Sequence, residues 1–95
     1  MTRVVWSTGA LADIDRLLAF LAPKSAAAAA RAYGAIVEAV ERLPEFPSRG
    51  VHAPDVSTRH RRLFVPFSSS GYRILYLDAD PIEIVAVNHM REPYD

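Results

Sequence analysis

The sequence predicts an α+β domain in which a helical hairpin packs on one face of a small, mostly antiparallel sheet. Three observations support this fold class. A short β-prone run opens the chain, two stretches with apolar residues three and four apart follow, and three further β-prone runs lie between Arg61 and His89. The expected element order is therefore β-α-α-β-β-β, in a single domain that spans residues 1–95.

The first strand and the first helix follow from β propensity and helix capping. Val4–Trp6 is a short β-prone run, and Ser7 or Thr8 can cap the helix after it by accepting a hydrogen bond from a free backbone N–H. Pro23 cannot continue a helix, so the helix is expected to end before it. Its apolar stripe comprises Leu11, Ile14, Leu17, Leu18 and Leu21.

A second helix is predicted from a cap at Ser25 to about Leu43, just before Pro44. Only Ala22-Pro23-Lys24 separates it from the first helix, which indicates an antiparallel hairpin. The run Ala26–Ala30 has high helix propensity, and its short side chains allow the helices to approach closely. The apolar stripe of this helix comprises Ala29, Tyr33, Ile36, Val37, Val40 and Leu43.

The second half of the chain predicts a loop and three strands. Prolines and a glycine punctuate residues 44–58, which are expected to form a long surface loop. Strands are expected at Arg61–Phe67, Tyr72–Asp78 and Ile82–His89, with a hairpin turn at Ser68–Gly71 between the first two. Both alternating sets of residues in the last strand are apolar, so we expect it to be covered on both faces and central in the sheet.

Composition excludes several classes of function. Eleven basic and eleven acidic residues give a formal net charge of zero, so sequence-specific DNA binding by this chain alone is not expected. Cysteine is absent, which excludes disulfides and thiol chemistry. His52 and His60 have no further ligand at metal spacing, so neither a metal nor a cofactor is expected. No apolar run reaches the ~18 residues that span a bilayer, and no signal peptide is evident, so a cytoplasmic location is expected.

Several short patterns then occur in a characteristic order. Leu63–Phe67, Ser70-Gly71-Tyr72 and Ala86–Glu92 resemble the strand, the turn and the closing motif of ParE-type toxins in the RelE/ParE toxin–antitoxin superfamily. The resemblance extends over essentially the whole chain. It implies a RelE/ParE-like fold and the toxin component of a type II toxin–antitoxin system. Such a toxin poisons DNA gyrase by binding rather than by catalysis, and a cognate ParD-like antitoxin neutralises it.

Two positions depart from the ParE pattern. Pro93 stands before Tyr94, where the family commonly has glycine, and Arg73 follows the turn tyrosine, where many ParE proteins have an apolar residue. An arginine at that point is similar to the RelE branch, whose members cleave mRNA on the ribosome with basic residues of their sheet. The alternative function is therefore a metal-independent endoribonuclease.

The candidate nuclease residues are Arg73, His89, Arg91 and Tyr94. The arginines could stabilise phosphate charge, the histidine could transfer a proton, and the tyrosine could stack on a base. Strand alternation is compatible with Arg73 and His89 on one side of the sheet, although register cannot be deduced from sequence. The simpler interpretation is that Arg73 pairs with a carboxylate (Asp78, Glu83 or Glu92) and His89 makes a structural hydrogen bond.

A basic cluster precedes and opens the first long strand. Arg59 and Arg61 should point one way and Arg62 the other. These cations could meet DNA phosphates, an acidic surface of gyrase or antitoxin carboxylates, or they could simply mark a charged edge strand. An inactive relative remains a third possibility. The full set of candidate target- or partner-binding residues is Arg59, Arg61, Arg62, Phe64, Phe67, Tyr76, Arg91 and Tyr94.

Overall fold

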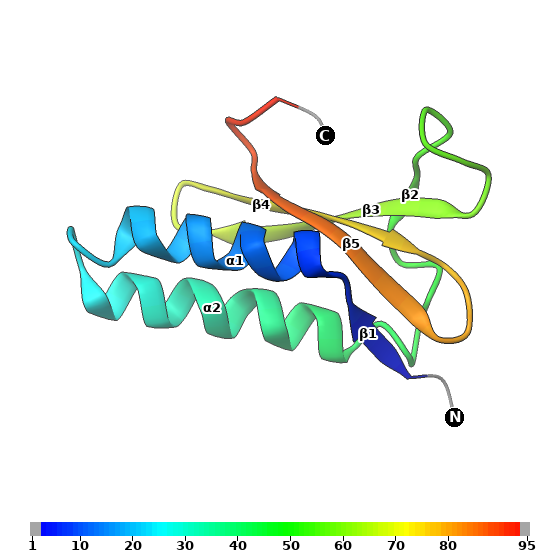
Figure 1. Cartoon of the computed structure of the whole chain (residues 1–95), viewed down its shortest axis with the longest axis horizontal. Coiled ribbons are helices and arrows are strands. Elements are labelled where there is room, and N and C mark those ends of the chain that lie inside the picture. The colour runs from blue at the N-terminus through cyan, green and yellow to red at the C-terminus, as the bar shows by residue number, and fades with distance from the viewer. Residues whose placement is uncertain (1–2, 94–95) are drawn as a thin grey trace.

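The computed structural model describes residues 3–93, so Tyr94 lies outside the described residues. Two antiparallel helices lie on one face of a five-stranded sheet, as Figure 1 shows, and the predicted α+β fold is confirmed. One element was not expected: the two-residue strand β2 lies within the predicted loop at residues 44–58. The elements are β1 (Val4–Trp6), α1 (Thr8–Leu21), α2 (Ala26–Glu41), β2 (Val51–His52), β3 (His60–Phe67), β4 (Ser70–Leu77) and β5 (Ile82–His89).

The strands lie in the order β1-β5-β4-β3-β2, with β1 parallel to β5 and the other pairs antiparallel. The prediction that the last strand is central was wrong, because β4 occupies the middle of the sheet. β4 is also the strand that is covered on both faces, with residues 71–76 buried without interruption. β5 is an interior strand whose fully buried side chains, Ile82, Ile84 and Val87, all face the helices.

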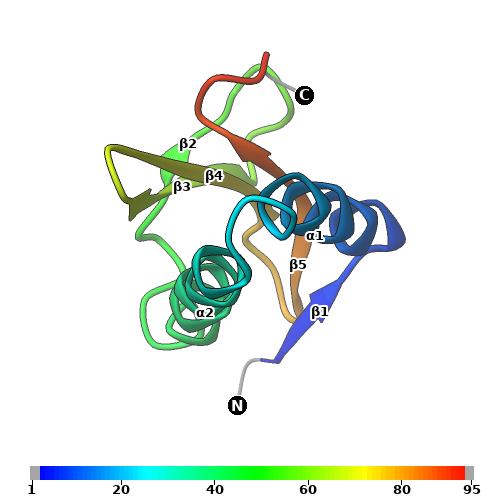
Figure 2. The ribbon, with the colours of Figure 1, turned by 90° about the vertical axis from the view of Figure 1, so that its left-hand side faces the viewer.

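Both helices begin where their caps predict. The Ser7 hydroxyl accepts the backbone N–H of Ala10 at 3.0 Å, and Ser25 caps α2 in the same way. Figure 2 looks along the hairpin and shows the helices beside each other under the sheet. α2 ends at Glu41, two residues before the predicted end. Leu11 and Tyr33 were expected in the apolar stripes, yet they are 51% and 49% exposed, and both line a small surface hollow beside Trp6 of β1.

The β3–β4 turn is tighter than predicted, because only Ser68 and Ser69 connect the paired residues Phe67 and Ser70. Ser68 has a φ of 55°, the left-handed conformation that two-residue hairpin turns require. Gly71 belongs to β4, and a Cβ placed there would lie 2.4 Å from the carbonyl oxygen of Val65. The glycine therefore permits close approach of the two strands next to the turn.

α1 covers the outer edge of β5 beyond the point where β1 ends. β1 pairs with β5 only as far as Ile84, which would leave the backbone groups of residues 85–89 open on that side. Side chains satisfy them instead. Ser7 Oγ donates to Val85 O (3.0 Å), Asp13 Oδ2 accepts from Val87 N (2.9 Å), an Arg16 guanidinium nitrogen donates to Val87 O (3.4 Å) and Glu92 Oε1 accepts from His89 N (2.8 Å).

Candidate partner-binding groove

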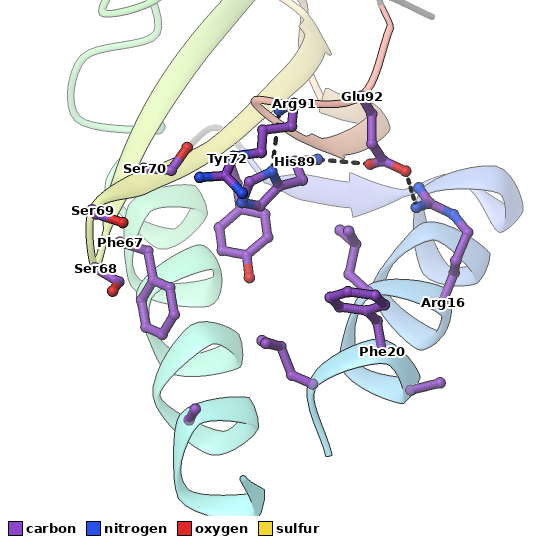
Figure 3. Close-up of a pocket in the computed structure, with 14 residues that line it drawn as sticks. Arg16, Phe20, Phe67, Ser68, Ser69, Ser70, Tyr72, His89, Arg91 and Glu92 are labelled. Atoms are coloured by element: carbon purple, nitrogen blue, oxygen red, sulfur yellow. Dashed lines mark hydrogen bonds and ion pairs between the residues drawn. The ribbon is translucent and has the colours of Figure 1, made fainter. Parts of the chain in front are cut away.

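A groove of about 830 Å³ opens between α1, the start of α2, the β3–β4 hairpin and the end of β5. Figure 3 shows the aromatic rings of the hairpin on one side and α1 on the other, with the residues after β5 closing one end. Its lining residues are Arg16, Leu17, Ala19, Phe20, Leu21, Ala28, Phe67, Ser68, Ser69, Ser70, Tyr72, His89, Arg91 and Glu92.

Aromatic rings form the body of the groove. The Tyr72 ring packs at a centroid distance of 5.8 Å from Phe67 and edge-on against the His89 ring at 5.4 Å. Burial raises the pKa of Tyr72, because the phenolate would lose its hydration there. On the opposite wall Phe20 is 67% exposed, with the Lys24 ammonium 3.6 Å from its ring centroid. Exposed aromatic surface around an apolar hollow is typical of a protein-binding site.

The rim of the groove is polar and carries charges of both signs. Arg16 of α1 forms an ion pair with Glu92, and it also contacts Asp13 at 3.3 Å. The second Glu92 carboxylate oxygen accepts the His89 backbone N–H. The Arg91 backbone N–H donates to His89 Nδ1 at 3.1 Å, while its guanidinium pairs with no carboxylate among residues 3–93. Arg16 therefore has two carboxylate partners, whereas Arg91 has none among residues 3–93.

Arg73 lies on the other face of the sheet. Its cross-strand neighbour is Asn88, whereas the neighbour of His89 is Tyr72, so Arg73 and His89 project to opposite sides. The interpretation that places them on one side is therefore wrong, and the reason is the β4–β5 register. Arg73 is 5% exposed and donates to the backbone carbonyls of His89 (3.1 Å), Glu92 (2.6 Å) and Pro93. Its guanidinium thus fixes the main chain after β5.

The basic cluster is largely engaged within the chain. Arg61 and Arg62 lie on opposite faces of β3, as alternation predicts. Arg61 donates to Asp78 (3.2 Å) and to the Gly50 carbonyl (2.9 Å). Arg62 binds Asp55 through two hydrogen bonds of 2.9 Å, and this side-chain hydrogen bonding lowers the pKa of Asp55. Arg59 is exposed. Internal partners for Arg61 and Arg62 favour a structural role for both.

The remaining aromatic candidates occupy three different environments. Tyr76 is fully buried, and its hydroxyl donates to the Pro47 carbonyl (2.6 Å) and accepts the Gly50 N–H (2.9 Å), so it is a core residue rather than a binding residue. Phe64 is 51% exposed on the face away from the helices. Phe67 lines the groove. Of the predicted binding set, the structure therefore brings Phe67 and Arg91 together in the groove.

Sequence reasoning missed Arg16 and Phe20 as groove residues. Phe20 carried a signal, because it is a large aromatic residue on α1 outside the apolar stripe. Within residues 3–93, no group of three His, Asp or Glu side chains is arranged to hold a metal ion. In the same range, neither helix has the length and the apolar character needed to cross a bilayer.

A small α+β domain with an open apolar groove and a charged rim has features that are typical of protein-binding domains. Comparison with known families gives the particular family. The model of the ParE toxin of type II toxin–antitoxin system, parDE, matches residues 4–94, and the chain belongs to this family. Among curated proteins, no relative matches the chain.

A solved structure described as the chromosomal ParDE TA system from P. aeruginosa has the same fold, with a TM-score of 0.74. The two chains are 21% identical, and the match covers 94% of this chain and 96% of the other. At this identity the likeness concerns the fold alone.

Proposed function

We propose that this ParE-family chain arrests growth by binding DNA gyrase and that a ParD-like antitoxin neutralises it by occupying the groove. The observation that carries the antitoxin part is the groove itself, where Phe20 is exposed on the wall opposite the Phe67 and Tyr72 rings. Burying a large aromatic side chain is a main source of binding free energy in protein interfaces. Family membership supports the toxin role.

A binding function is favoured over the nuclease alternative by the environment of Arg73. A metal-free ribonuclease needs a cation and a proton-transferring group at the same phosphate. Here Arg73 is buried, bonds to three backbone carbonyls and lies on the opposite face of the sheet from His89. Arg73 therefore cannot share a phosphate with His89, and Arg91 is the one cation of the predicted nuclease set that lines the groove beside that histidine.

The target is tested with purified chain and purified gyrase. We expect ATP-dependent supercoiling of a relaxed plasmid to fall as the chain is added, with no cleavage of mRNA on stalled ribosomes. Undisturbed supercoiling at molar excess, in a preparation that still arrests growth when expressed, would rule out gyrase as the target. Cleavage of mRNA that disappears in an Arg73→Ala, His89→Ala double variant with an unchanged circular dichroism spectrum would establish the nuclease instead.

The antitoxin is tested with the product of a short open reading frame next to the gene, if its N-terminal part is predicted to bind DNA. We expect co-expression to restore growth and to yield a complex. Phe20→Ser should weaken that complex, because it removes the exposed ring from the groove. Phe46→Ser is the matched control, since Phe46 is 64% exposed and does not line the groove. Equal weakening by both substitutions would place the antitoxin elsewhere.

A further inference from the structure

The ion pair between Arg16 and Glu92 lies at the rim of the groove and joins α1 to the segment after β5. The side chains of Arg16 and Glu92 are 44% and 33% exposed, so water reaches both of them. Solvent-exposed ion pairs contribute little to stability, because water and salt screen them. The Arg16 guanidinium can therefore exchange one carboxylate for another without a large change in the fold.

The charges of the rim favour a partner that brings a carboxylate. Arg16 and Arg91 both line the groove, and Glu92 is the one acidic residue among the lining residues. Covering the groove removes water from the two guanidinium groups, and a desolvated cation requires a hydrogen-bonding anion nearby. A purely apolar partner segment would leave Arg91 without such an anion among residues 3–93.

The segment after β5 can tolerate the loss of the Glu92 contact. Arg73 holds its main chain from the other face of the sheet through the carbonyls of His89, Glu92 and Pro93. The position of the backbone therefore depends mainly on Arg73, and the Glu92 side chain adds one hydrogen bond, from the His89 N–H to its Oε1. Glu92 Oε2 can leave Arg16 while Oε1 keeps that bond and the segment stays in place.

We propose that the partner segment in the groove carries a carboxylate that replaces Glu92 at Arg16. This inference rests on the proposed function, in which an antitoxin occupies the groove, and it adds the chemistry of recognition. The occupant is an apolar segment with an acidic side chain at its edge. Glu92 then acts as an internal competitor, which occupies Arg16 in the free chain and has to be displaced when the antitoxin binds.

Removing the competitor gives the decisive test. In Glu92→Gln the amide oxygen can still accept the His89 N–H, but the negative charge at Arg16 is lost. We expect the Kd for the antitoxin, measured by titration calorimetry with the purified chain, to fall about twofold to fivefold. Arg16→Gln should raise it about tenfold. Glu38→Gln is the matched control, because it breaks an exposed ion pair on α2 that lies outside the groove, and it should leave the Kd unchanged.

The direction in which Glu92→Gln changes the Kd distinguishes carboxylate exchange at Arg16 from a structural role of Glu92. If Glu92 only shapes the groove, Glu92→Gln weakens binding or leaves it unchanged, and the inference is overturned. Adding Glu92→Gln to Arg16→Gln should not lower the Kd below that of Arg16→Gln alone, since Glu92 competes only for that arginine. A gain of the same size in the double variant would also contradict the exchange.

A second arm leaves this chain unaltered and applies even if a variant does not fold. Each acidic residue of the antitoxin is converted to its amide, and the Kd is measured with the wild-type chain. We expect one conversion to weaken binding about tenfold at low salt and much less at high salt. If no conversion weakens binding, the inference fails. If no complex forms at all, the proposed antitoxin function itself fails.

Discussion

Replacing Tyr76 with phenylalanine removes one buried oxygen atom and changes nothing else in the side chain. The hydroxyl makes two hydrogen bonds, to the Pro47 carbonyl and from the Gly50 N–H. These bonds tie the loop before β2 to the centre of the sheet. In Tyr76→Phe, both backbone groups lose their partner at a position that is fully buried in the native chain.

The expected cost follows from the two bonds. A net contribution of about 1 kcal/mol for each hydrogen bond gives a loss of about 2 kcal/mol in the free energy of unfolding. For a domain of 95 residues this corresponds to a fall in Tm of about 8–16 °C. The ring remains in place, so no cavity larger than the hydroxyl is formed and no further packing loss is expected.

Urea unfolding followed by circular dichroism measures the change, with Tyr33→Phe as the matched control. Tyr33 is 49% exposed, and its hydroxyl has no partner among residues 3–93, so its loss should change the free energy by less than about 0.5 kcal/mol. The Gly50 amide, protected in the wild type by the Tyr76 hydroxyl, should exchange with deuterium faster in Tyr76→Phe. Equal stability of the two variants would refute the reasoning.

Three further predictions concern the helices and pH. Gly34→Ala in α2 should stabilise the chain by about 0.5–1 kcal/mol in urea unfolding, since an added Cβ meets no atom within 4 Å; a loss of stability would contradict this. Asp13→Ala should lower the free energy of unfolding by about 1–2 kcal/mol in the same assay, because the Val87 N–H loses its hydrogen-bond partner. The control Asp15→Ala, at an exposed position, should change it little, and equal losses would refute the role of Asp13. Burial raises the pKa of both tyrosines of β4, so their stabilising contribution is complete below pH 10 and is lost as pH rises through the higher pKa values of the folded state. If the urea concentration at the unfolding midpoint does not decrease as the pH is raised from 9 to 11, that assignment is contradicted.

Local patterns in the sequence were sufficient for the helices and for the number of long strands. Ser7 and Ser25 cap helices where the sequence indicates, because capping involves only residues a few positions apart. β-Prone runs bounded by turn residues placed β3, β4 and β5 for the same reason. β2 was missed because it has two residues, and its pairing with β3 provides the only sign of it.

The groove could not be predicted, because its walls come from elements far apart in the chain. Strand alternation gives the two faces of one strand, but only the register shows that Tyr72 rather than Arg73 shares a face with His89. Tyr76 has the same local pattern as an exposed aromatic residue of a half-buried strand. Its burial depends on the loop around Pro47, which folds over it from a distant part of the chain.

The most informative contrast in the molecule is between its two arginines that hold the segment after β5. In the sequence both are cations near apolar residues, and nothing local separates them. Arg73 is 5% exposed and bonds to main-chain carbonyls, which no competing side chain can replace. The Arg16 side chain is 44% exposed and bonds to a carboxylate, which another carboxylate can replace. Because Arg73 fixes the backbone, Arg16 is free to exchange its carboxylate partner. We therefore expect the Glu92 side chain to move on antitoxin binding, while the segment that carries it stays in place.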